Sequence, residues 1–165
     1  MLKEVAGDIL LSNAQVIAHG VAPGDHFDSG LALGLREKYP TMAKDFRHYC
    51  KVGNPSPGGT WTWGGPEGVR IACLMTQEPA HNEGAKPGPA TSHNVSKALR
   101  DFAKEAKSEG YTSIALPRLA TGYGQMKWEE VRPLIEQHLG GLGIPILVYS
   151  EYHAGVKADE GLAKV

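Results

Sequence analysis

Short apolar runs along the chain alternate with longer segments in which apolar residues recur every three or four positions. The short runs predict buried β-strands, and the longer segments predict amphipathic α-helices. We expect strands at 5–11 (broken at Gly7-Asp8), 14–21, 60–63, 69–75, 114–116 and 146–149. We expect helices at 31–38, 42–51, 92–109 and 128–139, with Thr41 as the N-cap of the second.

Strands that alternate with helices indicate the α/β class, here a three-layer α/β/α sandwich around a mixed, mostly parallel central sheet. The segments 60–63 and 69–75 are separated by a glycine-rich turn, which predicts an antiparallel pair at the edge of that sheet. We expect a single domain over 1–150, followed by a polar tail, 151–165, with no clear contribution to the core.

The composition of the 165-residue chain is that of an ordinary globular domain, with 41% hydrophobic and 21% charged residues. A net charge of −1 argues against coating nucleic acid by bulk electrostatics, but it leaves recognition of a modified end or a single nucleotide open. Cys50 and Cys73 match no zinc spacing, so we expect no metal and free thiols in a reducing compartment, the cytoplasm. No apolar run is long enough for a membrane span, and the first residues do not resemble a signal peptide.

A glycine-containing loop, 119–124, follows the predicted strand 114–116 and precedes the predicted helix at 128. Backbone N–H groups in such a loop, together with the positive end of a helix dipole, favour the binding of phosphate. An ordinary strand-to-helix turn explains the same spacing, and both interpretations stay open. The loop is neither a Walker loop, since no Gly-Lys-Ser/Thr closes it, nor the dinucleotide motif GxGxxG.

Three loops are expected to meet at one edge of the sheet, namely 22–30, 76–89 and 119–124. In α/β sheets, ligands bind at the carboxyl ends of the strands, where loops from different strands converge. The loop 76–89 is longer than a simple connection needs, which is typical of functional loops.

Polar side chains in and beside these loops each have a functional and a structural interpretation. Asp8 is either a carboxylate that accepts from an amino group, such as that of adenine, or a turn residue bonded to its own backbone. Asp28 or Ser29 is predicted to cap the helix that begins near residue 31. His19, in an apolar strand, is typical of a core or rim histidine, whereas His81 is either an acid–base group or a solvated loop residue.

Three segments together resemble the macrodomain, the ADP-ribose-binding fold. Gly7-Asp8-Ile9-Leu10 resembles its GDI motif, and 17–20 with 27–32 resembles its first ligand loop and the helix that follows. The segment 116–124 (LPRLATGYG), with Lys127-Trp128 behind it, resembles the second ligand loop. The similarity covers about residues 5–150. It is closest to the branch that contains the terminal ADP-ribose protein glycohydrolase and the antitoxins that remove ADP-ribose from DNA.

The resemblance implies a site for ADP-ribose. In this scheme Asp8 takes the adenine amine and Ile9 its neighbouring edge, and Tyr149 or Tyr152 flanks the adenine ring. Residues 29–31 line the distal ribose and pyrophosphate, and residues 121–124 cradle the phosphates. Besides Asp8, Ile9 and Tyr149, the implied ligand set is His19, Ser29, Gly30, Leu31, Leu119, Ala120, Thr121, Gly122, Tyr123 and Gly124.

The chain departs from the family pattern at the positions that the resemblance marks as catalytic. Ala22-Pro23 stands in the region of an asparagine pair, Gln77-Glu78 where a lysine is expected, and Gly124 where an aspartate is expected. Unless Lys86 from the same loop replaces that lysine, the resemblance implies that water is the nucleophile. Asp28 or His81 is then the candidate group that orients or deprotonates the water.

The expected function is that of an ADP-ribosyl hydrolase that needs no cofactor. Its first expected target is an ester of ADP-ribose with glutamate or aspartate in a protein, and its second is an adduct on DNA or a nucleotide. We expect a monomer with no membrane contact. Three alternatives stay open: a reader that binds ADP-ribose without turnover, a phosphatase acting on ADP-ribose 1″-phosphate through His19 or His81, and a generic nucleotide-binding α/β domain.

Overall fold

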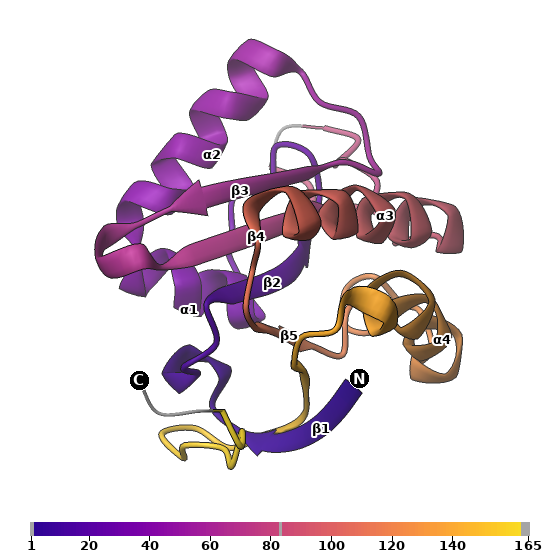
Figure 1. The fold of residues 1–165 in the computed structure, drawn as a ribbon. Coiled ribbons are helices and arrows are strands. Elements are labelled where there is room, and N and C mark those ends of the chain that lie inside the picture. The colour runs from indigo at the N-terminus through magenta and orange to yellow at the C-terminus, as the bar shows by residue number, and fades with distance from the viewer. Residues whose placement is uncertain (1, 83, 163–165) are drawn as a thin grey trace.

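The computed structural model describes residues 2–82 and 84–162 (Figure 1). Its strands form one six-stranded sheet in the order β1-β6-β5-β2-β4-β3. They are β1 (Leu2–Gly7), β2 (Val16–Val21), β3 (Thr60–Gly64), β4 (Arg70–Met75), β5 (Ile114–Pro117) and β6 (Ile146–Tyr152). The β3–β4 pair is antiparallel and the other pairs are parallel, so the predicted mixed, mostly parallel sheet with an antiparallel edge is confirmed.

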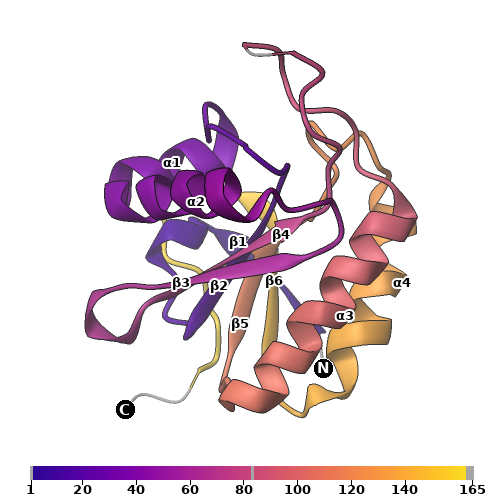
Figure 2. The ribbon, with the colours of Figure 1, turned by 90° about the horizontal axis from the view of Figure 1, so that it is seen from above.

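Helices cover both faces of the sheet (Figure 2). On one face lie α1 (Gly30–Lys38) and α2 (Pro40–Gly53), and on the other lie α3 (Ser92–Glu109) and α4 (Trp128–Leu139). An apolar core fills the space between the sheet and each helical layer. Phe27, Leu35 and Phe46 belong to the core on the α1–α2 side, and Leu99 and Phe102 to the core on the α3–α4 side. The three-layer sandwich is therefore confirmed.

The long helix α3 has the bounds that the apolar periodicity of its sequence predicts. The Thr91 side chain accepts a hydrogen bond from the Asn94 N–H at the helix start, and Gly110 ends the helix in the left-handed conformation at φ 67°. Between these caps Val95, Leu99 and Phe102 are fully buried. The element spans 92–109, as the sequence predicts.

Helix α2 begins two residues before its predicted start. Pro40 occupies the first turn, and Tyr39 is the N-cap residue. Proline favours this position because its fixed φ suits a helix and its missing N–H would have no helical partner there. The prediction that Thr41 caps the helix is therefore wrong.

The first predicted strand is also wrong at its carboxyl end. Strand β1 stops at Gly7, and Ile9–Leu11 forms a short 3₁₀ helix, capped by the Asp8 side chain, which accepts from the Leu10 N–H at 3.0 Å. Three consecutive apolar residues suggested a strand, but the Asp8 cap turns the chain. Strand β2 begins at Val16, two residues later than expected.

The chain after β6 differs most from expectation. Residues 153–162, hereafter the C-terminal strap, run beside the carboxyl end of β1 (Figure 1). Glu160 is 8% exposed, and Ala158 and Leu162 pack against the core on the α1–α2 side. The strap therefore contributes to the core, contrary to the expectation for a polar tail. Residues 163–165 of the predicted tail lie outside the described residues.

Within the described residues, no helix is sufficiently long and apolar to cross a membrane. Cys50 and Cys73 are both free thiols.

Candidate functional site

A cleft of about 780 Å³ opens at the carboxyl ends of β2, β4 and β5. Its walls come from residues in 23–32, 77–87 and 117–124, the three loops that the sequence predicts to converge. Parallel strands direct their carboxyl ends to one edge of the sheet, which is why loops so distant in the chain meet there.

The first wall is held in shape by an aspartate that the sequence analysis did not single out. The Asp25 carboxylate accepts hydrogen bonds from the Ala22 N–H at 3.1 Å and the Phe27 N–H at 2.9 Å. Phe27 adopts the left-handed conformation at φ 58°, and its buried ring packs at 5.0 Å from the Phe46 ring centroid. An aspartate that accepts from nearby backbone N–H groups, here one before it and one after it, is a usual means of fixing a turn.

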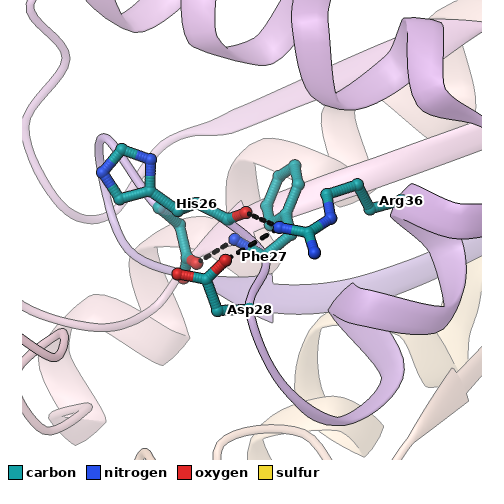
Figure 3. Close-up of polar contacts among 5 residues, drawn as sticks. His26, Phe27, Asp28 and Arg36 are labelled. Atoms are coloured by element: carbon teal, nitrogen blue, oxygen red, sulfur yellow. Dashed lines mark hydrogen bonds and ion pairs between the residues drawn. The ribbon is translucent and has the colours of Figure 1, made fainter.

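Asp28 lies on this wall and is oriented by a neighbouring cation (Figure 3). Its carboxylate accepts a hydrogen bond from the Arg36 guanidinium at 2.8 Å, and the same Arg36 nitrogen donates to the His26 carbonyl at 3.0 Å. The Asp28 side chain is 73% exposed, so it is positioned by Arg36 but open to solvent and to a ligand.

Ser29 stands at the N-cap position of α1, but its side chain makes no capping hydrogen bond. The prediction that Ser29 is the N-cap residue is therefore confirmed, but its hydroxyl does not cap the helix. Ser29, Gly30 and Leu31 all line the cleft, so the first turn of α1 faces the cavity. The N–H groups of a first helical turn lack helical acceptors and favour an anion.

The glycine loop forms the second wall. The Met126 N–H donates to the Ala120 carbonyl and the Gln125 N–H to the Gly122 carbonyl, both at 3.0 Å. A Cβ atom on Gly124 would lie 2.4 Å from the Ala120 carbonyl oxygen, so this turn accepts no side chain at position 124. The aspartate that the family pattern leads one to expect there has no room in this loop.

The helix whose N-terminus lines the cleft is not the one that the sequence analysis expected, α4, but α1. Helix α4 begins only at Trp128, which does not line the cleft; its ring instead lies 5.7 Å from the Arg118 guanidinium. The helix start that lines the cleft belongs to α1. The glycine loop thus shares the cleft with the N-terminus of α1, and not with that of the helix that follows it in sequence.

The long loop forms the third wall and is tied to the glycine loop. The Ala90 N–H donates to the Gly124 carbonyl at 3.0 Å, and the Lys86 ammonium lies 5.6 Å from the Tyr123 ring centroid. The Gln77 amide donates to the Gly88 carbonyl at 3.1 Å, which closes the base of the loop. His81 and Lys86 both line the cleft.

The charges of the cleft favour an anionic ligand. Lys86 and Arg118 bring two cationic groups to its lining. Among the described lining residues two carry carboxylates, and both already have donors, because Asp25 is bonded to backbone N–H groups and Asp28 to Arg36.

His19 lies beneath the cleft as a neutral group. Burial lowers its pKa to about 4, and its Nε2 atom is 3.3 Å from the Cys73 sulfur. Its ring packs at 5.7 Å from that of Phe27. His19 is therefore a core residue at the rim of the site, as its apolar strand predicts, and not a solvent-accessible acid–base group.

Most of the predicted site residues come together in this one cleft. They are Asp28 and His81 of the catalytic set, and His19, Ser29, Gly30, Leu31, Leu119, Ala120, Gly122, Tyr123 and Gly124 of the ligand set. Four predicted ligand residues do not line it: Asp8, Ile9, Thr121 and Tyr149. The Thr121 hydroxyl donates to the Arg118 carbonyl at 2.7 Å and belongs to the turn itself.

Sequence reasoning missed Asp25, Arg36 and Arg118 as site residues. The spacing of Asp25 before the helix is the one local signal that an Asx turn would be found there. The roles of Arg36 and Arg118 depend on where α1 and the glycine loop lie in space. No cluster of three or more potential metal ligands occurs among the described residues.

The Macro domain family model matches residues 26–135, which contain most of the cleft. The chain belongs to the macrodomain family. The segments that resemble the two macrodomain ligand loops, 17–20 with 27–32 and 116–124, both contribute residues to this one cavity.

Named relatives of this macrodomain act on ADP-ribosyl groups. A DNA ADP-ribosyl transferase–DNA ADP-ribosyl glycohydrolase fusion protein of Thermosipho africanus is 24% identical over 90% of the chain, which spans only 41% of that relative. Human ADP-ribose glycohydrolase OARD1 is 24% identical, covering 88% of the chain and 89% of the relative. Among solved structures, the macrodomain of Thermus aquaticus DarG matches with a TM-score of 0.80 at 25% identity, over 91% of this chain and 98% of that one. The family resemblance and the fold are confirmed.

Proposed function

We propose that this macrodomain binds ADP-ribose in the cleft and hydrolyses ADP-ribosyl linkages. The observation that carries the proposal is the meeting, in one cavity, of the α1 N-terminus, the glycine loop and two cationic side chains. Such an arrangement suits a diphosphate flanked by sugars, because N–H groups and cations both stabilise its negative charge. The names of the relatives support the same ligand and the same reaction class.

In the proposed complex the diphosphate lies between the first turn of α1 and residues 120–124. The distal ribose lies beside Asp28, Ser29 and Gly30, beneath the loop that carries His81 and Lys86. This placement sets the linkage to be cut at the open mouth of the cleft, where a large carrier molecule has room.

Water is the proposed nucleophile. Its oxygen bonds to the anomeric carbon of the distal ribose as the bond from that carbon to the carrier oxygen breaks. The carrier leaves as a carboxylate with the electron pair, so little general-acid help is needed. The water's proton passes to the Asp28 carboxylate, which Arg36 holds in place at 2.8 Å, or to His81. N–H groups of the α1 start and the glycine loop stabilise the charge of the diphosphate throughout.

An ester with glutamate or aspartate in a protein is the first proposed substrate, and an adduct on DNA is the second. The bacterial relative named above is a DNA ADP-ribosyl glycohydrolase fusion, which supports testing both carriers side by side. Hydrolysis of the ester is chemically the easier of the two, since its leaving group is the weaker base.

A reader of ADP-ribose without turnover is the alternative that a specific observation favours. Gln77 and Glu78 occupy the positions where a catalytic lysine is expected. The Gln77 amide bonds the Gly88 carbonyl, and Glu78 accepts from the Asn94 amide at 3.1 Å. Position 124 accepts no side chain, so neither expected catalytic group has a direct substitute at its own position.

The test is a calorimetric titration with ADP-ribose, followed by incubation with a glutamate-ADP-ribosylated protein and with ADP-ribosylated DNA. Binding with release of free ADP-ribose supports the hydrolase, and the carrier that is cleared identifies the substrate. Binding without release makes the protein a reader, and absence of binding rejects both. Asp28→Asn and His81→Gln then separate the two proposed proton acceptors, because only the acting residue lowers turnover while binding persists.

A further inference from the structure

A second cavity, of about 400 Å³, lies outside the cleft and is lined by cations. It opens between residues 97–104 of α3 and the loop 55–59, which connects α2 to β3 (Figure 2), and we call it the α3 groove. A Cβ atom on Gly58 of that loop would lie 2.7 Å from the Lys97 Cδ atom, so the lysine stem packs directly against the loop. Among the described residues, none lines both the α3 groove and the cleft.

Three basic side chains form a row along one face of α3. They are exposed, they line the groove, and they stand at positions i, i+3 and i+7: Lys97, Arg100 and Lys104. Residues at this spacing lie above one another on a helix, so the row is about 10 Å long. Within the described part of the chain, no salt bridge neutralises any of the three. Asp101, which also lines the groove, already accepts the Thr60 N–H at 3.0 Å, so the groove has a net positive charge.

The groove also has an aromatic side chain in its lining. Tyr49, from α2, lines the groove and is half-buried. Its ring stacks on that of Trp61, with the ring centroids 5.7 Å apart and the planes inclined by 22°, and it lies 6.4 Å from the Phe46 ring. These neighbours hold the tyrosine ring in one orientation where it meets the cavity. A base that stacks on such a ring gains contact energy whatever its identity.

We propose that the α3 groove binds a single strand of nucleic acid. The phosphates of the strand contact the row of three cations, and one base stacks on Tyr49. A positively charged groove with an aromatic platform is the combination by which proteins hold single strands. An inorganic polyphosphate would use the cations alone, and a base paired in a duplex would have no free face for the tyrosine. The net charge of −1 for the whole chain does not oppose this binding, because the attraction comes from the local charge.

The groove and the cleft meet the carboxyl end of the same strand. Met75, the last residue of β4, lines the groove, and Gln77, two residues later, lines the cleft. The inference does not rest on the proposed function, since an unmodified nucleic-acid strand supplies every group that the groove contacts.

The test is fluorescence anisotropy of the full chain with a labelled, unmodified oligothymidylate about twelve nucleotides long. Binding is expected at low salt. The logarithm of the affinity is expected to fall with the logarithm of the salt concentration at a slope of about −2, because each of three phosphate contacts contributes about −0.7 on a single strand. Absence of binding at about 50 mM salt overturns the proposal.

The double variant Lys97→Gln/Lys104→Gln removes two cations of the row. It is expected to weaken binding at least about tenfold and to reduce the salt slope to about −0.7. Lys107→Gln is the matched control, because this lysine is exposed on the same helix but does not line the groove. The control is expected to change the affinity less than about twofold. Equal losses for each charge removed in the two proteins would show a bulk attraction only and overturn the proposal.

Tyr49→Leu tests whether the ligand has bases. The variant keeps an apolar side chain beside Trp61 but loses the ring, so binding is expected to weaken about fivefold while the salt slope stays the same. An unchanged affinity assigns the groove to phosphate alone and overturns the proposal. Competition by tripolyphosphate as strong as that by unlabelled strand, at equal phosphate concentration, overturns it as well.

Saturating ADP-ribose separates binding in the groove from binding in the cleft. The labelled strand is expected to stay bound, since no described residue lines both cavities. Displacement of the strand by ADP-ribose places it in the cleft and overturns the inference. A protein that binds the strand through Lys97 and Lys104 but does not bind ADP-ribose supports this inference and rejects the proposed function.

Discussion

The two ends of the predicted ligand site have opposite characters. At the open end, around 28–31 and 120–124, short-range hydrogen bonds from the backbone and from Asp25 and Arg36 fix the loops, and most of their residues line a cavity. At the strap end, around Asp8, Ile9 and Tyr149, the polar groups are buried and bonded to residues 155–160. A family motif present in the sequence therefore does not guarantee that its side chain is free to meet a ligand.

The two ends are also stabilised by different kinds of contact. The strap end depends on contacts between residues far apart in the chain, whereas the loops of the open end depend on local turns and on the buried residues beneath them. Substitutions that disturb one end are expected to leave the other in place, and this expectation can be measured.

The largest effect is expected at the strap end from Glu160→Ala. It leaves two hydroxyls and one backbone N–H without their acceptor in a buried region, which costs about 3 kcal/mol of unfolding free energy. Urea unfolding measures the loss, and the exposed Glu109→Ala is the control. A change of less than about 0.5 kcal/mol would show that the strap is not held as described.

Acidification is expected to lower the free energy of unfolding through His19, which lies beneath the cleft. Burial lowers its folded-state pKa to about 4, below the value near 6.5 in an unfolded chain. As the pH falls from 6.5 towards 4, the unfolded chain binds a proton that the folded protein does not, so stability is lost across this window. The expected loss between pH 7.5 and 4.5 is about 2.5 kcal/mol. Comparing unfolding of the wild type with that of His19→Gln isolates this contribution, which disappears in the variant.

Gly124→Ala is expected to deform the glycine loop, because the new methyl group meets the Ala120 carbonyl oxygen. Overpacking of this kind costs about 2 kcal/mol of unfolding free energy, and ADP-ribose binding is expected to weaken with it. Gly122→Ala is the matched control for stability, since a Cβ atom there meets nothing within 4 Å. Equal melting temperatures for the two variants would contradict the tight turn.

The smallest expected effect has the opposite sign. Ala120 holds the left-handed conformation at φ 65°, which is strained for a residue with a side chain. Ala120→Gly removes that strain but adds freedom to the unfolded chain, so a net stabilisation of about 0.5 kcal/mol is expected. Thermal unfolding detects a gain of this size, and the strap-end contacts with Asp8 are expected to stay unchanged in hydrogen exchange.

Local patterns predicted the fold well where each element carries its own signals. Helix α3 has a threonine cap, a glycine stop and a regular apolar face, and the 60–75 hairpin has its turn. The meeting of the three loops also followed, because it depends only on strand direction.

The strap was not predictable from local patterns. Glu160 reads as one more charge in a polar segment, and its partners Ser12 and Asn13 lie 148 and 147 positions away in the chain. The same holds for the space at Gly124, since only the folded turn brings the Ala120 carbonyl against it. The folded backbone decides what each of these residues contacts, through distant partners for Glu160 and through the shape of a tight turn for Gly124.

The pairing of β1 with β6 has a consequence for how the chain acquires its fold. Strand β1 is an edge strand whose neighbour in the sheet is β6, and Leu2 faces Ile146. A ribosome therefore completes β1 long before it makes the strand with which β1 pairs. Closing so long a loop is entropically costly and slow, so the first strand waits, unpaired, while the rest of the sheet is assembled. During that interval its exposed edge is open to a chaperone or to a neighbouring nascent chain.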